Sequence, residues 1–526
     1  MRSRIAGDFL CFSLFAQGLT DMPTASDAEP NQVKSPRRRM GLFDCTMIVM
    51  GSMIGSGIFI VSADMVRLLG SPGWLLAAWG LTGLLTVCGA LVYGELAGMF
   101  PHAGGQYVFL REAWSPLTGF LYGWTLFAVI QTGTIAAVAV AFAKFAGVLV
   151  PWFSESRYII SPIHLSDHYA ISLSTAQSTA IALIALLTWI NIRGLHYGRL
   201  VQNIFTIAKT GGLLALIVIG LTAAWKPDIV SHHWEHLWQR YPTTSVASGL
   251  NAKSLWGLIA ALGVAQVGSL FSADSWHVIS FAAEEVDRPQ RNLPLSMALG
   301  TFAVTGLYLL ANLSYLGGLD LTEIASAPSD RVGTELLSRV FPNWGARLMS
   351  IVILISTLGC NNGLILSGAR ALYAMARDGL FFRKAAYLNA QGTPAFGLIL
   401  QGIWSSLLVL PRTFDPDRGV YGNLYGDLLD YVVSAALLFY MLTIAGLFRL
   451  RWRRPDQQRP VVAWGYPWLP AIYLAGAGLI VAILVLYRPT TTWPGLALVA
   501  TGLPVFAWWN RRSSGMAKKP VSPNQL

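Results

Sequence analysis

The sequence predicts an all-α integral membrane protein with twelve transmembrane helices. Of its 526 residues, 54% are hydrophobic and only 12% are charged, about half the charged fraction usual for a soluble domain. Long apolar runs recur regularly along the chain, and two of them are interrupted by small polar residues. Because a soluble fold could not bury this much apolar surface, we treat the chain as one membrane domain.

The predicted spans follow from length, since a hydrocarbon core of ~30 Å requires about 20 helical residues. Twelve runs meet this requirement, and they cover residues 43–68, 73–99, 117–150, 175–191, 200–224, 255–283, 293–318, 344–376, 395–411, 428–450, 467–487 and 493–510. The transmembrane domain is therefore expected at residues 41–511, between a disordered tail at 1–40 and a second tail at 512–526.

The Lys and Arg residues set the expected orientation, because cytoplasmic segments are enriched in them near span ends. Roughly two-thirds of the 37 Lys and Arg residues lie in alternate segments that share a side with both termini. Both termini are therefore predicted to be cytoplasmic, which makes this a multi-pass protein of the cell (inner) membrane.

The first 40 residues begin with MRSR and a short apolar stretch, which resembles a secretory signal. However, Asp8 interrupts the apolar stretch, and Arg37, Arg38 and Arg39 precede the first span. These charges favour a cytoplasmic tail over a signal peptide.

Composition also excludes several classes of partner and cofactor. The net charge of +11 comes from residues between apolar runs rather than from a basic stripe, so no nucleic-acid partner is expected. Cys11, Cys45, Cys88 and Cys360 lie in the tail or in apolar segments, so we expect no structural disulfide. The histidines of the segment 232–236 lie among tryptophans and are better explained by an interfacial loop than by a metal site, and no cofactor is expected.

The first interruption reads GSMIGSGIF and begins at Gly51. Clustered Gly and Ser make local unwinding inexpensive, since Gly costs about 1 kcal/mol relative to Ala within a helix. A half-helix that starts near Gly57 would direct free N–H groups toward an anion, while the carbonyls that end the other half would attract a cation. The alternative is that Gly51 and Gly55 only allow close helix packing.

The second interruption reads GSLFSADSW and begins at Gly268. It places Asp274 at membrane depth, where a charge costs on the order of 3 kcal/mol and therefore marks a functional candidate. The two interruptions are five spans apart. This separation is expected for inverted repeats in which spans one to five are related to spans six to ten.

Four stretches resemble the amino acid, polyamine and organocation superfamily. They are GSMIGSGIF at Gly51, YGELAGMFPHAGGQYVFL at Tyr93, EEVDRPQRNLP at Glu284 and SGARALYAMARDG at Ser367. The resemblance extends from about Gly41 to the last span and is strongest to bacterial permeases and L-type transporters. It implies a leucine-transporter-like five-plus-five fold with discontinuous helices 1 and 6.

The same resemblance implies a binding site for an amino acid at the two interruptions. The substrate carboxylate would meet the backbone amides of Gly55, Ser56 and Gly57. The ammonium group would meet carbonyls around Met53 and Ile54. An aromatic residue at the position of Phe271 acts as a lid in L-type transporters, whereas ordinary packing is the alternative for Phe271.

Asp274 and His277 are the candidates for side-chain selection. Asp274 stands where large-neutral carriers have glycine and resembles the aspartate of relatives that accept cationic substrates. Three roles for Asp274 remain open, namely pairing with a substrate cation, carrying a proton, and capping a half-helix. His277 is a candidate for selectivity or proton transfer, with hydrogen-bonded packing as the alternative.

Lys209 lies about 10 residues into the fifth predicted span, which is ~15 Å deep. From this depth its ammonium group is expected to face protein rather than the membrane surface. In the resembling family, a lysine here stands where sodium-coupled relatives bind an ion, which implies sodium-independent transport by proton coupling or exchange. Lys144 is nearer the end of its span and is expected to snorkel to the surface.

Two further groups of polar residues carry weaker expectations. Glu95 and the pair Glu284–Glu285 lie near inner span ends, where an ion pair with Arg111, Arg288 or Arg291 would form an inner gate. Asn361 and Asn362 would line the pathway or form hydrogen bonds between helices.

These observations predict a secondary active transporter of amino acids, not an enzyme, that works by alternating access. The alternatives are a polyamine or organocation permease of the same fold, and a membrane sensor that does not transport. The expected partners are an amino acid substrate, the lipid bilayer and protons. Some L-type relatives join a glycoprotein heavy chain through a disulfide, which is not expected here because the segment 151–175 contains no cysteine.

Overall fold

The computed structural model describes residues 40–102, 104–193, 198–241, 254–415 and 419–516. The predicted tail at 1–40 lies almost wholly outside the described residues. The last helix continues to Met516, five residues beyond the boundary predicted at 511.

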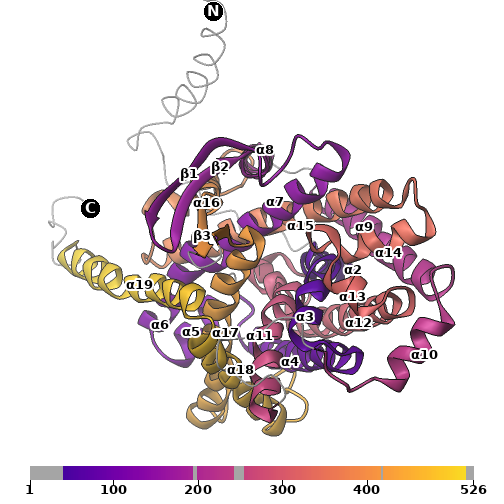
Figure 1. Cartoon of the computed structure of the whole chain (residues 1–526). Coiled ribbons are helices and arrows are strands. Elements are labelled where there is room, and N and C mark those ends of the chain that lie inside the picture. Colours follow the sequence, from indigo (N-terminus) through magenta and orange to yellow (C-terminus); the bar gives the residue numbers. More distant parts are fainter. Residues whose placement is uncertain (1–39, 103, 194–197, 242–253, 416–418, 517–526) are drawn as a thin grey trace, which may run out of the picture. The chain divides into compact units, whose positions relative to one another are not determined.

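The described chain is mainly helical (Figure 1). Its helices, including short 3-10 and π segments labelled η, are α2 (Leu42–Met53), η1 (Gly57–Phe59), α3 (Val61–Leu69), α4 (Pro72–Met99), α5 (Gln106–Ala113), α6 (Pro116–Thr125), η2 (Leu126–Ile130), α7 (Gln131–Leu149), α8 (Thr175–Ile192), α9 (Gly198–Leu221), α10 (Pro227–Glu235), α11 (Leu255–Ser272), η3 (Val278–Glu285), α12 (Pro289–Gly318), α13 (Leu321–Ala325), η4 (Pro328–Asp330), α14 (Val332–Val340), α15 (Gly345–Arg377), η5 (Arg383–Ala386), α16 (Ala395–Leu408), α17 (Leu424–Arg453), α18 (Trp468–Tyr487) and α19 (Pro489–Met516).

Nine helices in the described residues are long and apolar enough to cross a membrane. They are α4, the continuous run from α6 through η2 to α7, and α8, α9, α11, α12, α15, α17 and α18; α2 and α16 are shorter apolar helices. Their bounds agree with the predicted spans to within a few residues, because length and hydropathy fix a membrane helix directly. The exception is α11, which ends at Ser272 although the predicted span continued to residue 283, since the second interruption ends the helix early.

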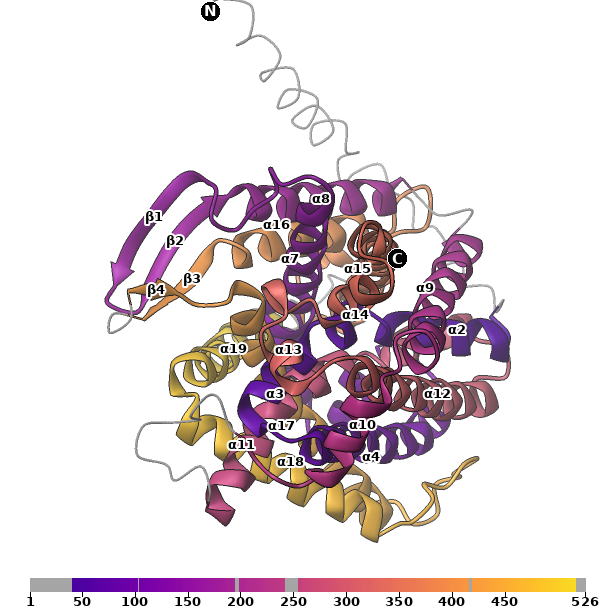
Figure 2. The same cartoon turned by 45° about the vertical axis from the view of Figure 1, so that its right-hand side comes forward.

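The predicted all-α class describes the membrane helices, and the described residues also form a small antiparallel sheet that the sequence did not predict. Its strands are β1 (Tyr158–Ser166), β2 (Tyr169–Ser174), β3 (Pro411–Asp415) and β4 (Val420–Tyr421), in the order β1-β2-β3-β4. Ala170 of β2 pairs with Arg412 of β3, so two loops far apart in sequence lie side by side. The sheet lies beside α8 and α16 (Figure 2).

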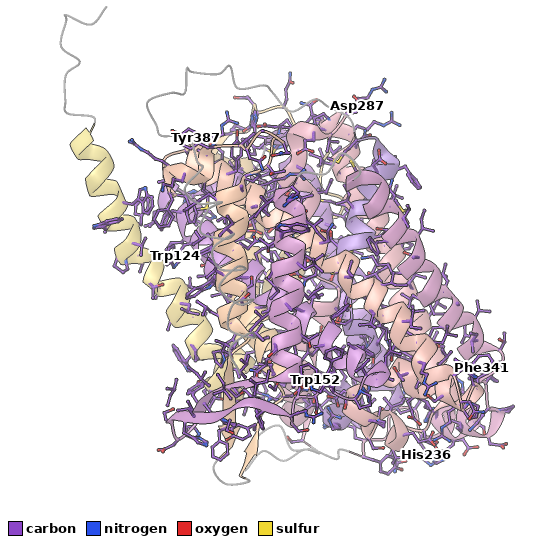
Figure 3. All side chains as sticks on the ribbon, turned by 90° about the horizontal axis from the view of Figure 1, so that it is seen from above. Trp124, Trp152, His236, Asp287, Phe341 and Tyr387 are labelled. Atoms are coloured by element: carbon purple, nitrogen blue, oxygen red, sulfur yellow. The ribbon has the colours of Figure 1, made fainter. Side chains whose placement is uncertain are left out.

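The two ends of the helices carry different segments (Figure 3). Asp287 and Tyr387, from predicted inner segments, lie at one end, whereas Trp152, His236 and Phe341, from predicted outer segments, lie at the other. The structure therefore places the two predicted sets of loops at opposite ends of the helices. We refer to these ends below as the inner and outer ends.

The centre of the helical body contains α2, packed against α9, α12 and α15. Its continuation α3 packs against α11, which in turn contacts α4, α17 and α18. The two apolar segments that carry the sequence interruptions therefore lie next to each other. Their neighbours α12 and α17 supply the other side chains of the site.

Candidate functional site

The first interruption lies between α2 and α3. α2 ends at Met53, Ile54 has extended backbone angles, and the short η1 begins only at Gly57. Among the described residues, the N–H groups of Gly55, Ser56 and Gly57 have no hydrogen-bond acceptor. These residues are buried, so the groups are available to a bound anion rather than to bulk water.

The second interruption follows α11, which ends at Ser272. Ser275 has a φ of 69°, a left-handed conformation that L-residues rarely adopt, and the 3-10 segment η3 begins at Val278. Such a conformation persists only where its surroundings enforce it, and it is concentrated at functional sites.

The two interruptions are in direct contact. A Cβ atom on Gly57 would lie 2.0 Å from Oγ of Ser272, so only glycine fits at this position. The hydroxyl group of Tyr308, on α12, lies 3.0 Å from the carbonyl oxygen of Met53 and 2.9 Å from that of Ser272. A single buried hydroxyl group therefore joins the ends of α2 and α11.

The carbonyl end of α2 is surrounded by donors from α9 and α15. The ammonium group of Lys209 donates to the carbonyl of Gly51, and Lys209 is only 1% exposed. Sγ of Cys360 lies 3.4 Å from the carbonyl oxygen of Ser52. The expectation that Lys209 faces protein is thus met by a specific contact with the first interrupted helix.

The carbonyls expected to meet a substrate ammonium group already have protein partners. Met53 accepts from Tyr308, while Oγ of Ser356 lies 3.4 Å from the carbonyl oxygens of both Ile54 and Gly55. A carbonyl oxygen has two lone pairs, so each can accept a second hydrogen bond.

Two aromatic residues lie on the outer side of the interruptions. The rings of Phe271 and Tyr425 meet edge to face with centroids 6.1 Å apart, and the Tyr425 hydroxyl is 3.3 Å from Oγ of Ser56. Above them is a cavity of about 550 Å³ that is lined in part by Val61, Gly268 and Tyr425. Tyr425 thus contacts the first interruption and lines this outer cavity, while Phe271 packs against Tyr425.

Asp274 and His277 share a third tyrosine, Tyr440 of α17. The Tyr440 hydroxyl lies 2.5 Å from Oδ1 of Asp274 and 3.3 Å from Nδ1 of His277. A second, much smaller cavity of about 20 Å³ adjoins Asp274, Tyr440 and Tyr473. Both predicted selectivity residues therefore belong to one buried polar cluster.

Tyr308, Tyr425 and Tyr440 were not predicted from the sequence as site residues. A lone tyrosine in an apolar span carries little signal, because aromatic residues are common in membrane helices. Only their positions beside the interruptions make these three residues stand out.

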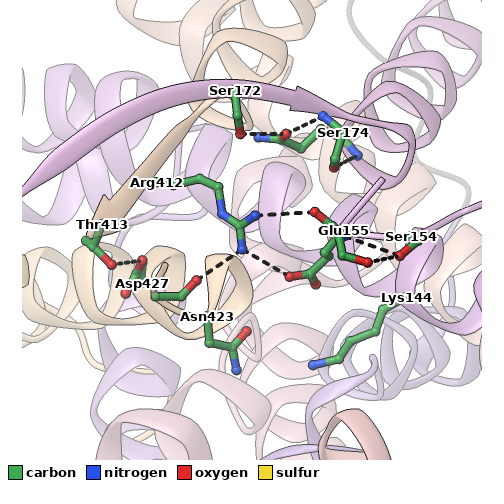
Figure 4. Close-up of polar contacts among 12 residues, drawn as sticks. Lys144, Ser154, Glu155, Ser172, Ser174, Arg412, Thr413, Asn423 and Asp427 are labelled. Carbon is green, nitrogen blue, oxygen red and sulfur yellow. Dashed lines mark hydrogen bonds and ion pairs between the residues drawn. The ribbon is translucent and has the colours of Figure 1, made fainter. Parts of the chain in front are cut away.

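Charged and polar groups line the outer cavity, and three of them, Thr413, Asn423 and Asp427, are drawn in Figure 4. Lys144 was expected to snorkel, but its side chain is 9% exposed and its ammonium group lies 3.6 Å from Asp330. Arg67 of α3 also pairs with Asp330, at 2.9 Å. Arg412 of β3 contacts Glu155 at 3.5 Å. Thr413 and Phe414 of the same strand line the cavity, so the sheet helps to bound it.

The inner-end ion pair predicted for Glu95 was assigned to the wrong partners. Glu95 is fully buried and pairs with Arg451 at 2.6 Å and with Arg459 at 3.4 Å, both at or beyond the inner end of α17. The backbone N–H of Ala463 also donates to Glu95, at 2.7 Å. Sequence proximity favoured other arginines, because nothing in the sequence shows that α4 and α17 meet.

The other residues expected to form ion pairs at the inner end also have partners that were not predicted. Arg111 pairs with Asp378, and Glu285 pairs with Arg370 at 3.0 Å. These ion pairs connect helices that are distant in sequence.

The remaining polar candidates have structural contacts. Nδ2 of Asn191 donates to Oδ1 of Asn362 at 2.8 Å, which is the hydrogen bond between helices considered as the alternative. Asn361 is buried, and its side chain has no partner among the described residues. His233 lies in α10 rather than a loop, and its Nδ1 is 3.0 Å from the carbonyl oxygen of Leu316. Burial lowers the pKa of His233, although this hydrogen bond opposes the shift.

The described residues contain neither a disulfide nor a cluster of metal-binding side chains. Cys45, Cys88 and Cys360 are buried and unpaired, while Cys11 lies outside the described residues. The described part of the chain holds no group of three potential metal ligands.

Comparisons with known proteins agree with this arrangement. A family model described as "Amino acid permease" matches residues 40–506. The mouse protein "Large neutral amino acids transporter small subunit 2" is 28% identical over 481 residues, which cover 90% of this chain and 82% of the relative.

Two other relatives show similar coverage. The human "b(0,+)-type amino acid transporter 1" is 28% identical over 84% of this chain and 81% of its own length. The mouse "Asc-type amino acid transporter 1" is 26% identical over 89% of this chain and 81% of its own length. The match from residue 40 to residue 506 includes both interruptions and every helix that contacts them. The chain therefore belongs to the amino acid permease family.

Proposed function

We propose that this permease is a secondary active transporter that moves amino acids across the cell membrane by alternating access. The observation that carries the proposal is the contact between two interrupted segments, with free amide groups on one side and a carbonyl end on the other. Such paired half-helix ends suit a zwitterion, which carries one charge of each sign. As a permease, the protein requires no enzymatic step.

The substrate carboxylate would bind the amides of Gly55, Ser56 and Gly57. Its ammonium group would bind the second lone pairs of the Met53 and Ile54 carbonyls. The Phe271 ring would close the site from the outer cavity, since it already packs against Tyr425. Asp274 and His277 would act on the substrate side chain, directly or through the Tyr440 hydroxyl.

The fold-level proposal is a bundle of twelve spans with a five-plus-five inverted repeat. Besides the nine long apolar helices, the interrupted α2–α3 segment, α16 and α19 would each supply one span. The α2–α3 and α11–η3 segments would occupy equivalent places in the two repeats as discontinuous helices 1 and 6. Both termini would be cytoplasmic, as the distribution of Lys and Arg indicates.

Transport would be sodium-independent, because the ammonium group of Lys209 already occupies the position beside the α2 carbonyl end where a cation would otherwise bind. A membrane-buried lysine in this position is suited to proton coupling or to exchange.

The relatives named above include a "small subunit", a title that implies a larger assembly for that protein. We propose that the present chain needs no disulfide-linked heavy chain. The segment 151–175, which includes β1 and β2, contains no cysteine that could make the bond.

The direct test is uptake of a radiolabelled panel of neutral, cationic and acidic amino acids and polyamines into proteoliposomes. Each compound is measured with a proton gradient, with internal counter-substrate, and with sodium replaced by choline. We expect amino acid uptake that survives sodium replacement. Transport of polyamines alone would change the substrate class, and binding without transport of any compound would favour a sensor.

A further inference from the structure

Asp274, Tyr440 and His277 form a continuous polar chain inside an apolar body. The Tyr440 hydroxyl lies 2.5 Å from Asp274 and 3.3 Å from His277, and the two ring side chains are 7% and 4% exposed. Among the described residues, Asp274 takes part in no ion pair, so no fixed protein cation neutralises its carboxylate. An uncompensated carboxylate in a membrane helix marks a substrate or proton pathway.

The groups packed around this chain are neutral. Tyr93 of α4 contacts both the His277 and the Tyr440 rings, with centroids 5.9 and 6.1 Å away. Tyr473 of α18 lines the small cavity beside Asp274, and Tyr122 of α6 is close enough to interact with the carboxylate electrostatically. Within the described residues, these three phenols are the other titratable side chains that face the cluster, and a phenol ordinarily loses its proton only at a much higher pH than a carboxyl or an imidazolium group.

The single hydroxyl proton of Tyr440 couples the protonation state of Asp274 to the position of the ring proton of His277. When Asp274 is ionised, the hydroxyl donates to it, and the Tyr440 oxygen then accepts from an N–H on Nδ1 of His277. When Asp274 is protonated, it donates to the Tyr440 oxygen. The hydroxyl then donates to a bare Nδ1, and the ring carries its proton on Nε2.

We propose that Asp274, Tyr440 and His277 form a proton relay, distinct from Lys209, that serves the transport function proposed above. A proton binds Nε2 of His277. The Nδ1–H bond then breaks as that proton passes to the Tyr440 oxygen, and the Tyr440 O–H proton passes to Oδ1 of Asp274. The imidazole and the phenol both end neutral, Asp274 ends protonated, and the net change is the uptake of one proton.

The position of the relay joins proton uptake to the second interruption. Asp274 comes two residues after the end of α11 and directly precedes the left-handed Ser275. The charge at the interruption would therefore change with each proton received. Lys209 occupies the corresponding place at the first interruption, so each interrupted segment would have its own titratable group.

The relay is tested with Tyr440→Phe, which removes one hydroxyl group and keeps the ring. Full-length protein is reconstituted into liposomes that contain a pH-sensitive dye, and substrate-induced proton influx and substrate counterflow are both measured. We expect proton influx to fall about tenfold or more, because general acid–base steps commonly contribute at least this factor. Counterflow, which requires no net proton movement, should continue.

Tyr387→Phe is the control, since it removes one hydroxyl group from a tyrosine that is 70% exposed at the inner end, away from the relay. It should leave both signals unchanged. Proton influx equal to wild type in Tyr440→Phe would overturn the relay, as would wild-type counterflow without any proton influx. Absence of counterflow in the wild type for the whole panel would instead remove the proposed transport function, and the relay with it.

A second measurement does not depend on transport. Infrared spectra recorded as the pH is lowered should show a protonated carboxyl band that is absent in Asp274→Asn and displaced in Tyr440→Phe. A band that Tyr440→Phe leaves in place would mean that the hydroxyl does not contact the titrating carboxyl group, and the relay would be excluded.

Discussion

The hydroxyl group of Tyr308 contacts both the end of α2 and the end of α11. Its oxygen is within 3.0 Å of both the Met53 and the Ser272 carbonyls, yet it has only one proton to donate. At any moment, therefore, only one of the two carbonyl oxygens accepts the full hydrogen bond from this hydroxyl group. A small displacement of either interrupted segment changes which carbonyl receives the proton.

Tyr308→Phe should destabilise the protein and impair transport. Removal of the hydroxyl leaves two buried carbonyls without this donor, at a cost of about 1–3 kcal/mol. We expect a lower Tm in detergent together with reduced uptake at saturating substrate. Tyr122→Phe serves as the control, because its hydroxyl makes no hydrogen bond in the described chain. Equal Tm values for the two variants would show that the bridge is energetically unimportant.

Lys209→Ala should abolish proton-driven uptake while some substrate binding remains. The ammonium group donates to the Gly51 carbonyl at the end of α2, so its loss removes a titratable group from the first interruption without altering the amides of residues 55–57. Gradient-driven uptake and equilibrium binding measured on the same preparation separate the two effects. Unchanged coupling would remove the role assigned to Lys209.

At the scale of elements, the contact between η1 and α11 depends on the absence of a side chain at Gly57. A Cβ atom there would lie 2.0 Å from Oγ and 2.8 Å from Cβ of Ser272. At Gly55 the nearest atom would be Sγ of Cys360 at 3.5 Å, which is ordinary van der Waals contact. Two glycines in one motif therefore have different structural requirements.

Gly57→Ala should be far more damaging than Gly55→Ala. Overpacking of a well-packed interior typically costs about 1–3 kcal/mol, and here it also separates the two interruptions. Tm and uptake should fall in Gly57→Ala and recover partly in the Gly57→Ala/Ser272→Gly double variant, which removes the clashing side chain. The packing explanation fails if the double variant is no better than the single one.

At the scale of the whole described body, the two ends differ. The outer end has a cavity of about 550 Å³ that reaches down to Tyr425, whereas the inner end of α4 is tied to the α17 end by the buried Glu95. A fully buried carboxylate is tolerated because two guanidinium groups and a backbone N–H surround it. This asymmetry is the one expected of an alternating-access protein in a state that is open at one end and closed at the other.

Glu95→Gln should weaken closure of the inner end. Breaking a buried ion pair by neutralising one partner commonly costs about 3–5 kcal/mol, because the remaining charges are left uncompensated. We expect a lower Tm and a shift of the population toward inward-open molecules, measured by labelling of single cysteines placed at the inner end. Glu112→Gln, which affects the more exposed pair with Arg454, is the control and should have little effect. A similar response of both variants would refute a closing role for Glu95.

Local features of the sequence predicted much of the fold and part of the candidate site. Apolar runs of sufficient length gave the helix bounds, and clustered Gly, Ser and Asp marked where α2 and α11 end. Lys209 and Asp274 were recognisable because a charge in an apolar span is costly and therefore conspicuous. These predictions need only hydropathy and backbone preference, which are properties of short segments.

Only the tertiary structure decided which groups meet. The sequence by itself determined a membrane protein with two interrupted helices, but it did not predict the outer sheet, the partners of Glu95, or the three tyrosines that bind Met53, Ser56 and Asp274. Such contacts join residues from about 160 to 370 positions apart in the chain. Their geometry depends on how whole helices pack, and packing is a collective outcome that no local pattern specifies.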